Sequence, residues 1–294
     1  MGNSSDETTN AQAHTEQPTN NVVEVSAWAQ ARSRLRHPST SVDDSTPPEL
    51  TDHSPSGLWR ADFEVHQGQH ADVNTSGMWV LAPVVESALR RSLPVFQLGE
   101  TGAGFHLLNQ ARDVVSNDLL CALRLFVIEE QEHARLHALV CQALDIPMLD
   151  DHWSERLFRR VRRVRGLRLE LLMMLIAEFV AVDVYETLSD GVGDPTLSRI
   201  FARMHADELR HLEFLAAVIP PHLERLPVPV RTLTRQAWRA LATVAVVVIS
   251  IEHRALLRSC GSGIRHFTNK TLSTIGSQQF RFFGDPTESS SPRH

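Results

Sequence analysis

One spacing occurs twice in this chain: a glutamate is followed thirty residues later by the first residue of a Glu-x-x-His motif. In chain order the members are Glu100, Glu130, His133, Glu178, Glu208 and His211. About one Glu-x-x-His match arises by chance in a chain of this length, so a single match would carry little weight. Two matches with the same upstream glutamate predict two related structural units. Because carboxylates and imidazoles together bind divalent cations, the repeat predicts a metal site.

Each copy of the spacing predicts a helical hairpin. In the first copy, the midpoint between the upstream glutamate and the motif falls beside the polar turn 116–118. In the second copy, it falls inside the helix-breaking run Ser189–Pro195. Two antiparallel helices that meet at such a turn carry both glutamates at the same height, about 22 Å from the turn. The turns and the ligand spacing therefore predict the same four helices.

The candidate ligands share helix faces with apolar residues. Glu130 lies one turn after Phe126, and Glu208 lies two turns after Phe201. The ligands should therefore face the interior of a bundle, where uncompensated carboxylates are prohibitively costly. Two divalent cations would supply a charge of about +4, and each would gain an imidazole. This mixed donor set suits iron or manganese better than the thiolate-rich sites of structural zinc.

Composition divides the chain into a tail, a helical domain and a second tail. The expected boundaries are 1–57 for a disordered N-terminal tail, 58–283 for the helical domain with a bundle core over 94–218, and 284–294 for a loose C-terminal tail. Within the domain, Ala82–Arg91 is expected as a lead-in helix, and Pro94 suits the first turn of the next helix. A further helix over 231–259 should pack against the bundle.

Charge and composition exclude several other classes. The formal net charge of −6 gives no indication of nucleic-acid binding. The longest apolar stretch, Ala240–Ile251, is well short of the roughly 20 residues needed to span a bilayer, and the first residues lack a secretory signal. The cysteines Cys121, Cys141 and Cys260 show no disulfide or zinc pattern. We therefore expect a cytoplasmic protein without a membrane span, and the near absence of lysine indicates a bacterial source.

With these features the chain resembles the ferritin-like di-iron carboxylate superfamily. The resemblance covers residues 80–260 and rests on the six candidate ligands and the acidic neighbours in EEQEH and DELRH. It implies an all-α fold, namely a ferritin-like four-helix bundle with an N-terminal lead-in helix and an additional C-terminal helix. It also implies two iron ions, with manganese as the alternative metal. Glu130 and Glu208 would be the bridging carboxylates.

Within this superfamily, the segment MHADELRHLEF is similar to that of the p-aminobenzoate N-oxygenase group. Members of that group carry an extra histidine ligand four residues before the last glutamate. Here Met204 occupies that position and His205 follows it, so either His205 supplies the ligand through a shifted helix or the seventh ligand is absent. The radical-generating subunit of ribonucleotide reductase is less similar, because His137 stands where its tyrosine would be expected.

Four neighbouring residues have two interpretations each. Glu129 and Asp207 directly precede ligands, so each could accept a hydrogen bond from the far nitrogen of a ligand histidine or be a solvated surface acid. His137, one turn beyond His133, is either a proton relay near the metals or a hydrogen-bonded core histidine. Tyr185, the only tyrosine, has core packing as its default role and redox chemistry as the alternative.

The function that the resemblance implies is an oxidoreductase that activates dioxygen to hydroxylate, desaturate or N-oxygenate a small molecule. Such an enzyme needs an external electron donor, a reductase or ferredoxin. The basic run Arg159–Arg168 is either a solvated helix face or, as the minor alternative, a docking surface for an acidic partner. A monomer or homodimer is expected. The alternatives are a bacterioferritin-like protein that oxidises and stores iron, and a structural bundle with a vestigial site.

Overall fold

The computed structural model describes residues 54–69, 73, 79–101, 104–154, 156 and 166–284. Within these ranges the chain forms helices joined by turns and short loops, with no strand, so the all-α prediction is confirmed for this part of the chain. The described residues belong to one compact unit. Most of the predicted N-terminal tail, residues 285–294 of the predicted C-terminal tail and most of the run Arg159–Arg168 lie outside these ranges. Residues 55–57, expected in the N-terminal tail, instead begin helix α2 (Pro55–His66).

Both predicted hairpin turns are present. The helices that flank them are α3 (Pro83–Thr101), α4 (Gly104–Ala111), α5 (Asn117–Ala143), α7 (Leu167–Gly191) and α8 (Pro195–Glu224). Ser116 caps α5 by accepting a hydrogen bond from the Leu119 amide at 3.3 Å. Asp194 caps α8 by accepting bonds from the amides of Thr196 and Leu197 at 2.9 and 3.0 Å. These side chains satisfy amide groups that a helix start leaves without partners, which fixes each turn at the predicted place.

The prediction that a new helix begins at Pro94 is wrong. Helix α3 continues through Pro94, and the predicted lead-in helix Ala82–Arg91 is its first half. A proline inside a helix removes one backbone hydrogen bond and typically costs about 3 kcal/mol. Pro94 is buried, so the packing of its ring against the core offsets this cost.

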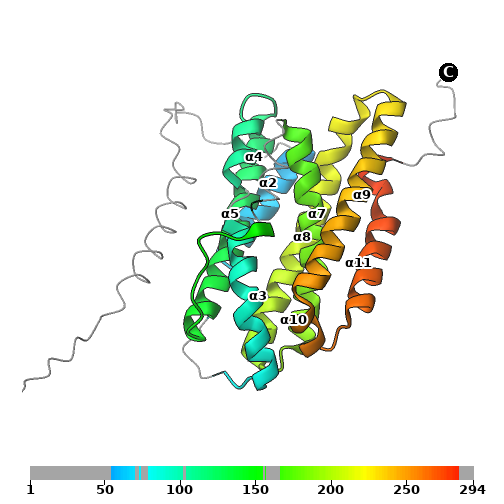
Figure 1. Ribbon diagram of the computed structural model, residues 1–294. Helices are drawn as coiled ribbons and strands as arrows, with labels where there is room; N and C mark the ends of the chain where they lie inside the picture. The colour runs from blue at the N-terminus through cyan, green and yellow to red at the C-terminus, as the bar shows by residue number, and fades with distance from the viewer. Residues whose placement is uncertain are drawn as a thin grey trace, which may run out of the picture. The chain divides into compact units, whose positions relative to one another are not determined.

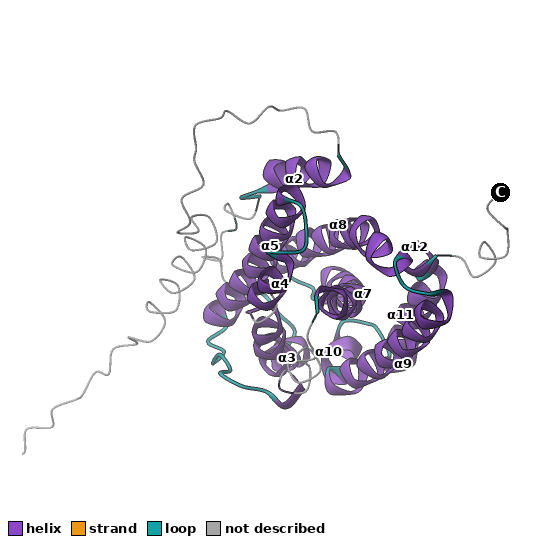
Figure 2. Ribbon diagram, turned by 90° about the horizontal axis from the view of Figure 1, so that it is seen from above, coloured by secondary structure: helices purple, strands orange, loops and turns teal. Residues whose placement is uncertain are grey.

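Helix α7 forms the centre of the arrangement. Figure 2 shows it end-on with α8, α9, α10 and α11 around it (Figure 2). Its sequence is apolar on all sides, with buried residues such as Leu171, Met174, Phe179 and Val182 that point in different directions around the helix. A helix that is hydrophobic all round is stable only when neighbours cover every face. Figure 1 shows α8 and α9 running alongside α7 (Figure 1).

The C-terminal region contains more helices than expected. The predicted single helix over 231–259 is divided into α9 (Val228–Glu252) and α10 (Arg254–Ser259), which meet at His253. They are followed by α11 (Ile264–Gln278) and the short α12 (Phe280–Phe283), which the sequence did not predict. In α11 only Phe267, Thr271 and Ile275 are buried, at intervals of four residues. A stripe with one buried residue per turn is too narrow to indicate a helix from the sequence alone.

An additional helix, α2 (Pro55–His66), covers the outside of the first hairpin. Its one fully buried side chain, Phe63, packs edge-on against Phe214 of α8, with 5.1 Å between ring centroids. Phe63 also contacts Phe126 of α5, at 6.3 Å between centroids. These aromatic contacts tie α2 to both hairpins next to the candidate ligands. In the part of the chain that the structure describes, no helix is both long enough and apolar enough to cross a bilayer.

Candidate metal centre

Six acidic and imidazole side chains converge inside the bundle in two overlapping groups. Within each group, one potential ligand atom from every residue lies within 4.8 Å of the others. One group contains Glu130, Glu178, Glu208 and His211, and the other contains Glu100, Glu130 and His133. Among the described residues, the members of these groups are the six side chains that the repeated spacing predicted. Buried groups of this composition could hold metal ions.

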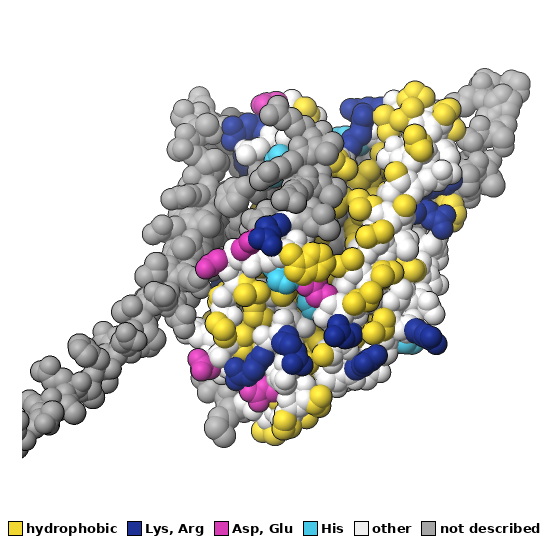
Figure 3. Space-filling model, in the orientation of Figure 1, with side chains coloured by type: hydrophobic (Ala, Val, Ile, Leu, Met, Phe, Trp, Pro, Cys, Tyr) yellow, Lys and Arg dark blue, Asp and Glu magenta, His cyan; other side chains and the backbone are white. Residues whose placement is uncertain are grey.

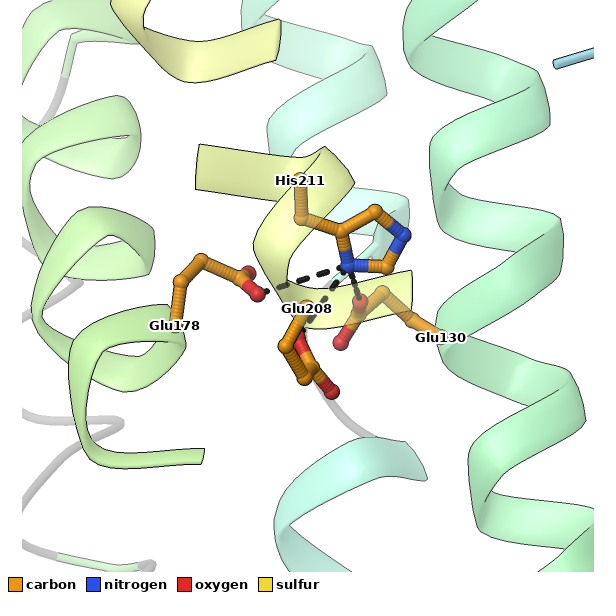
Figure 4. A group of neighbouring side chains, drawn as sticks. All are labelled: Glu130, Glu178, Glu208 and His211. Atoms are coloured by element: carbon orange, nitrogen blue, oxygen red, sulfur yellow. Dashed lines mark hydrogen bonds and ion pairs between the residues drawn. The ribbon is translucent and has the colours of Figure 1, made fainter. Parts of the chain in front are cut away.

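The helices bring these residues together from four directions. Each Glu-x-x-His pair occupies adjacent turns of one helix face, so Glu130 and His133 project together from α5, and Glu208 and His211 project together from α8. Glu178 approaches from the central helix α7 (Figure 4), and Glu100 approaches from α3. His211 and His133 are fully buried, and Glu178 and Glu208 are nearly so. Most of the site therefore lies in the core, and the half-buried Glu100 lies at its edge.

The two glutamates of the Glu-x-x-His motifs lie between the two histidines. Glu208 presents one carboxylate oxygen to each ring: Oε1 is 3.0 Å from His133 Nδ1, and Oε2 is 3.2 Å from His211 Nδ1. Glu130 belongs to both groups, and its Oε1 is 2.8 Å from His211 Nδ1. Figure 4 shows His211 Nδ1 directed at Glu130, Glu178 and Glu208 (Figure 4). Carboxylates in this position can bridge two cations.

The far nitrogens of the two histidines contact the acidic residues that precede the motif glutamates, and they do so crosswise. His133 of α5 has its Nε2 3.2 Å from Asp207 Oδ2 of α8. His211 of α8 has its Nε2 3.0 Å from Glu129 Oε2 of α5. Both acids are buried, so they are not solvated surface residues. Each hydrogen bond leaves Nδ1 to face the carboxylates, which is the ring orientation that a metal ligand requires.

Arg210 joins the two outer acids and was not predicted from the sequence. Its guanidinium lies 2.6 Å from Glu129 Oε2 and 3.0 Å from Asp207 Oδ1, with Asp62 of α2 at 3.5 Å. The pKa of Arg210 is raised because these carboxylates outweigh the opposing effect of burial. Its position three residues after Asp207 in DELRH places both on one helix face, which is the sequence pattern that could have identified it.

Without a bound cation, burial and the closeness of the charged side chains set the pKa values of the cluster. Burial, followed by the charge of Glu130, raises the pKa of Glu100 and of Glu178 well above the usual carboxyl range. Burial acts to lower the pKa of His133 and of His211, but the surrounding carboxylates outweigh it and raise both. Protons therefore neutralise part of the acidic charge in the absence of metal. A divalent cation would displace these protons on binding.

Several oxygens in the cluster lack hydrogen bonds. Among the described residues, Glu130 Oε1, Glu178 Oε2 and Glu208 Oε1 are buried and have no hydrogen-bond partner of acceptable geometry. Buried polar atoms almost always have partners, because leaving one unsatisfied costs roughly 1–3 kcal/mol. All three residues belong to the converging groups. Carboxylate oxygens of this kind could bind a metal ion.

Tyr185 connects Glu100 to His137. The Tyr185 hydroxyl donates to Glu100 Oε1 at 2.6 Å and lies 2.9 Å from His137 Nε2. Burial lowers the pKa of His137 to about 3, so this imidazole is neutral and donates to the tyrosine oxygen. His137 is thus a hydrogen-bonded core histidine that is one link removed from the candidate ligands. Tyr185 does more than fill the core, because it holds one of the six acids in place.

Three residues near the site are not members of the converging groups: Gly99, Gly104 and His205. His205 donates from Nδ1 to the carbonyl oxygen of Val182 at 3.0 Å and belongs to neither group of converging atoms. Gly104 packs so tightly that a Cβ there would lie 2.0 Å from a methyl group of Val127. Gly99, by contrast, has no atom within 4 Å of the place where its Cβ would lie, and it borders open space. The three cysteines are free, as expected.

A cavity of about 460 Å³ opens beside the cluster. Its walls come from α3, α7 and α9, and four of the candidate ligands form part of its lining: Glu100, Glu130, Glu178 and Glu208. Most of the remaining wall is aliphatic or aromatic, including Phe96, Met173 and Val248. Cavities of about 300–1,000 Å³ commonly bind small molecules. The sequence alone did not reveal this cavity, because its walls come from helices far apart in the chain.

No protein-family model, curated protein sequence or solved structure matches this chain. The assignment of the site therefore rests on its residues and their geometry.

Proposed function

We propose that the chain is a non-haem di-iron oxidoreductase, and that α3, α5, α7 and α8 form a ferritin-like bundle around its metal pair. Glu100, Glu130 and His133 would hold one iron, and Glu178, Glu208 and His211 the other. Glu130 and Glu208 would bridge them. The observation that carries the proposal is the pair of overlapping buried groups with Glu130 in common. A set of four glutamates and two histidines on facing helices is suited to binding two cations that share carboxylate ligands.

The residues around the ligands support this assignment. Glu129 and Asp207 would hold the imidazoles in the orientation that exposes Nδ1 to the metals, since their hydrogen bonds fix the opposite nitrogen. Tyr185 would orient Glu100 by donating a hydrogen bond to one of its oxygens. Ferrous ions in such a site supply the electrons that activate dioxygen. With six protein ligands for two metals, coordination positions stay open for an external molecule.

The cavity favours oxidation of a small molecule over storage of iron. Four candidate ligands form part of its wall, so a molecule inside it would lie against the metal pair. The predominantly apolar remainder of the wall would exclude water from this contact. An iron-storage protein has no need of such a cavity, although its metal ligands would be the same. Hydroxylation, desaturation and N-oxygenation all agree with this arrangement, and each requires an external electron donor.

The proposal is tested by loading the metal-free full chain with iron(II) under anaerobic conditions and then admitting dioxygen. We expect two irons per chain by metal analysis. Mössbauer spectroscopy should show conversion of a ferrous pair to a coupled ferric pair within the first turnover. Fewer than one iron per two chains would instead support a structural bundle. Two bound ferrous ions that do not react with dioxygen would rule out oxygen activation.

Size-exclusion chromatography of the same sample separates the enzyme from the storage protein. A monomer or homodimer that takes up two irons per chain supports the enzyme. A large hollow oligomer that accumulates many irons per chain supports storage and would overturn the proposal.

A further inference from the structure

We propose that the substrate cavity binds an uncharged, largely apolar molecule that carries one neutral polar group, and that His253 forms the hydrogen bond with this group. As a statement about the substrate, this inference rests on the proposed di-iron function. As a statement about what the cavity binds, it stands on the cavity wall alone. The two can therefore be tested separately.

The shape of the cavity follows from the packing of α7. Helix α7 packs along its length on α8 but makes few contacts with α3 and α9. The cavity is the space between α3, α7 and α9. One wall is the α9 face that carries Leu241, Ala245 and Val248, and the opposite walls belong to α3 and α7. The lining residues Gly99 and Ala177 are exposed, so the cavity is open to solvent. Its volume of about 460 Å³ suits a small molecule.

Apolar side chains continue from the cavity to the outside of α9. Val244 lines the cavity and is nevertheless 56% exposed, and Ile251 on the same helix is 52% exposed. Trp153, another lining residue, is 47% exposed. Figure 3 shows apolar side chains gathered over α9 on this face of the molecule (Figure 3). An apolar molecule would thus lose contact with water progressively as it entered.

The charges of the lining exclude ionised ligands. Among the described lining residues, the charged side chains are the four candidate ligands, all of them acidic, and neither lysine nor arginine is present. In the metal-free chain, a carboxylate in the cavity would give up its hydration without gaining a cationic partner, which is costly in an apolar environment. In the iron-loaded chain, a cationic amine would have to leave water for a wall whose acidic residues the metals neutralise. A neutral molecule meets neither penalty.

His253 provides a polar group in the cavity lining. It is 2% exposed and packs against Phe96, with 4.3 Å between ring centroids and 42° between the ring planes. Among the described residues its Nε2 is buried and has no hydrogen-bond partner. Burial, followed by the charge of His152, lowers its pKa to about 4, so the ring is neutral. A buried polar atom without a partner, on a side chain that lines a cavity, can complete its hydrogen bonding with a ligand after a small movement of the ring.

A matched set of ligands tests these points on the full chain, both metal-free and loaded with iron(II). The set consists of naphthalene, 2-naphthol, 2-naphthoate and 2-naphthylmethylamine, whose ring system is constant while the substituent is absent, neutral, anionic or cationic. Binding is measured by ligand fluorescence and by calorimetry. We expect 2-naphthol to bind most tightly among the neutral and disfavoured ligands of each form. In the metal-free chain 2-naphthoate should bind at least about tenfold more weakly, and in the iron-loaded chain 2-naphthylmethylamine should do so. Equal or tighter binding of 2-naphthoate by the metal-free chain would overturn the inference.

Two kinds of variant locate the binding. Ala245→Phe should fill the cavity from α9, a helix that carries none of the candidate ligands, and weaken all neutral ligands more than about tenfold. Its matched control is Ala202→Phe, an exposed position on α8 outside the cavity, which should leave binding unchanged. His253→Phe should weaken 2-naphthol about fivefold, the loss expected for one neutral hydrogen bond, and leave naphthalene unaffected. His253→Gln should retain most of the preference for 2-naphthol.

The outcomes distinguish the two proposals. Suppose that neutral ligands bind, that Ala245→Phe and His253→Phe weaken binding as expected, and that no iron pair assembles. In that case the cavity inference stands and the proposed function fails. If the iron pair assembles and reacts but Ala245→Phe binds 2-naphthol like the unmodified chain, the cavity is not the ligand site and this inference is wrong. Equal losses of naphthalene and 2-naphthol in His253→Phe would assign His253 to packing alone.

Discussion

Glu129 of α5 lies beside His211 of α8, with 3.0 Å between Glu129 Oε2 and His211 Nε2. The same relationship holds in the other direction between Asp207 and His133, at 3.2 Å. Each hairpin thus supplies the acid that orients the histidine of the other hairpin. Neither half of the repeat makes a complete site by itself, which gives a physical reason why both copies of the spacing are needed in one chain.

This crosswise arrangement predicts the effect of removing one outer acid. Glu129→Gln should lower the affinity for iron(II) or manganese(II) by about 10–100-fold, because the amide no longer fixes the tautomer or raises the basicity of His211. Competition with a fluorescent chelator measures the affinity. Glu224→Gln, at an exposed end of α8, is the control and should have no effect. An unchanged affinity in Glu129→Gln would show that the contact does not tune a metal ligand.

The shared position of Glu130 predicts a difference in metal stoichiometry. Glu178→Ala removes a member of one group only, so we expect about one metal per chain instead of two. Glu130→Ala removes a member of both groups and should leave less than one. Metal analysis after anaerobic loading and desalting measures both values. Glu213→Ala, an exposed acid on α8, should retain the full complement. Identical stoichiometry in the two ligand variants would contradict a bridging role for Glu130.

Arg210 should stabilise the fold through the two outer acids. Replacing one partner of a buried ion pair typically costs roughly 3–5 kcal/mol, and partial exposure of Arg210 reduces this to about 2–3 kcal/mol for Arg210→Met. Urea unfolding of metal-free protein measures the change. Arg281→Met, which removes an exposed pair with Glu213, should cost less than about 1 kcal/mol. Similar losses in the two variants would mean that the outer acids do not depend on Arg210.

His253 should make the fold sensitive to acid. Its pKa is lowered to about 4, whereas an unfolded histidine titrates near 6.5, so between these values the unfolded chain binds a proton that the folded chain does not. The free energy of unfolding therefore falls as the pH falls through this window, by about 2 kcal/mol between roughly pH 7.5 and pH 5. Urea unfolding measures this free energy at both pH values. In His253→Gln it should fall less between pH 7.5 and pH 5 than in the unmodified chain, and the difference should be about 2 kcal/mol. An equal loss in both proteins would refute the assignment.

The sequence predicted the two hairpins well because their information is local. Ser116 and Asp194 cap helices through amides two or three residues away, and the apolar stripes of α5, α7 and α8 repeat at helical spacing. It failed at Pro94, where the cost of a proline inside a helix is offset by burial of its ring. It also missed α2 and α11, whose few buried residues have meaning only once their neighbours are known.

The identity of the converging side chains was therefore determined by the sequence, since equal spacing on antiparallel helices brings Glu100, Glu130, Glu178 and Glu208 to one height. The partner of each outer acid was decided only by tertiary structure. Glu129 and Glu130 are neighbours in sequence but point in different directions around α5, and only the packing of α5 against α8 directs Glu129 to His211. The cavity has the same origin, because its volume is the space that three helices distant in sequence leave between them.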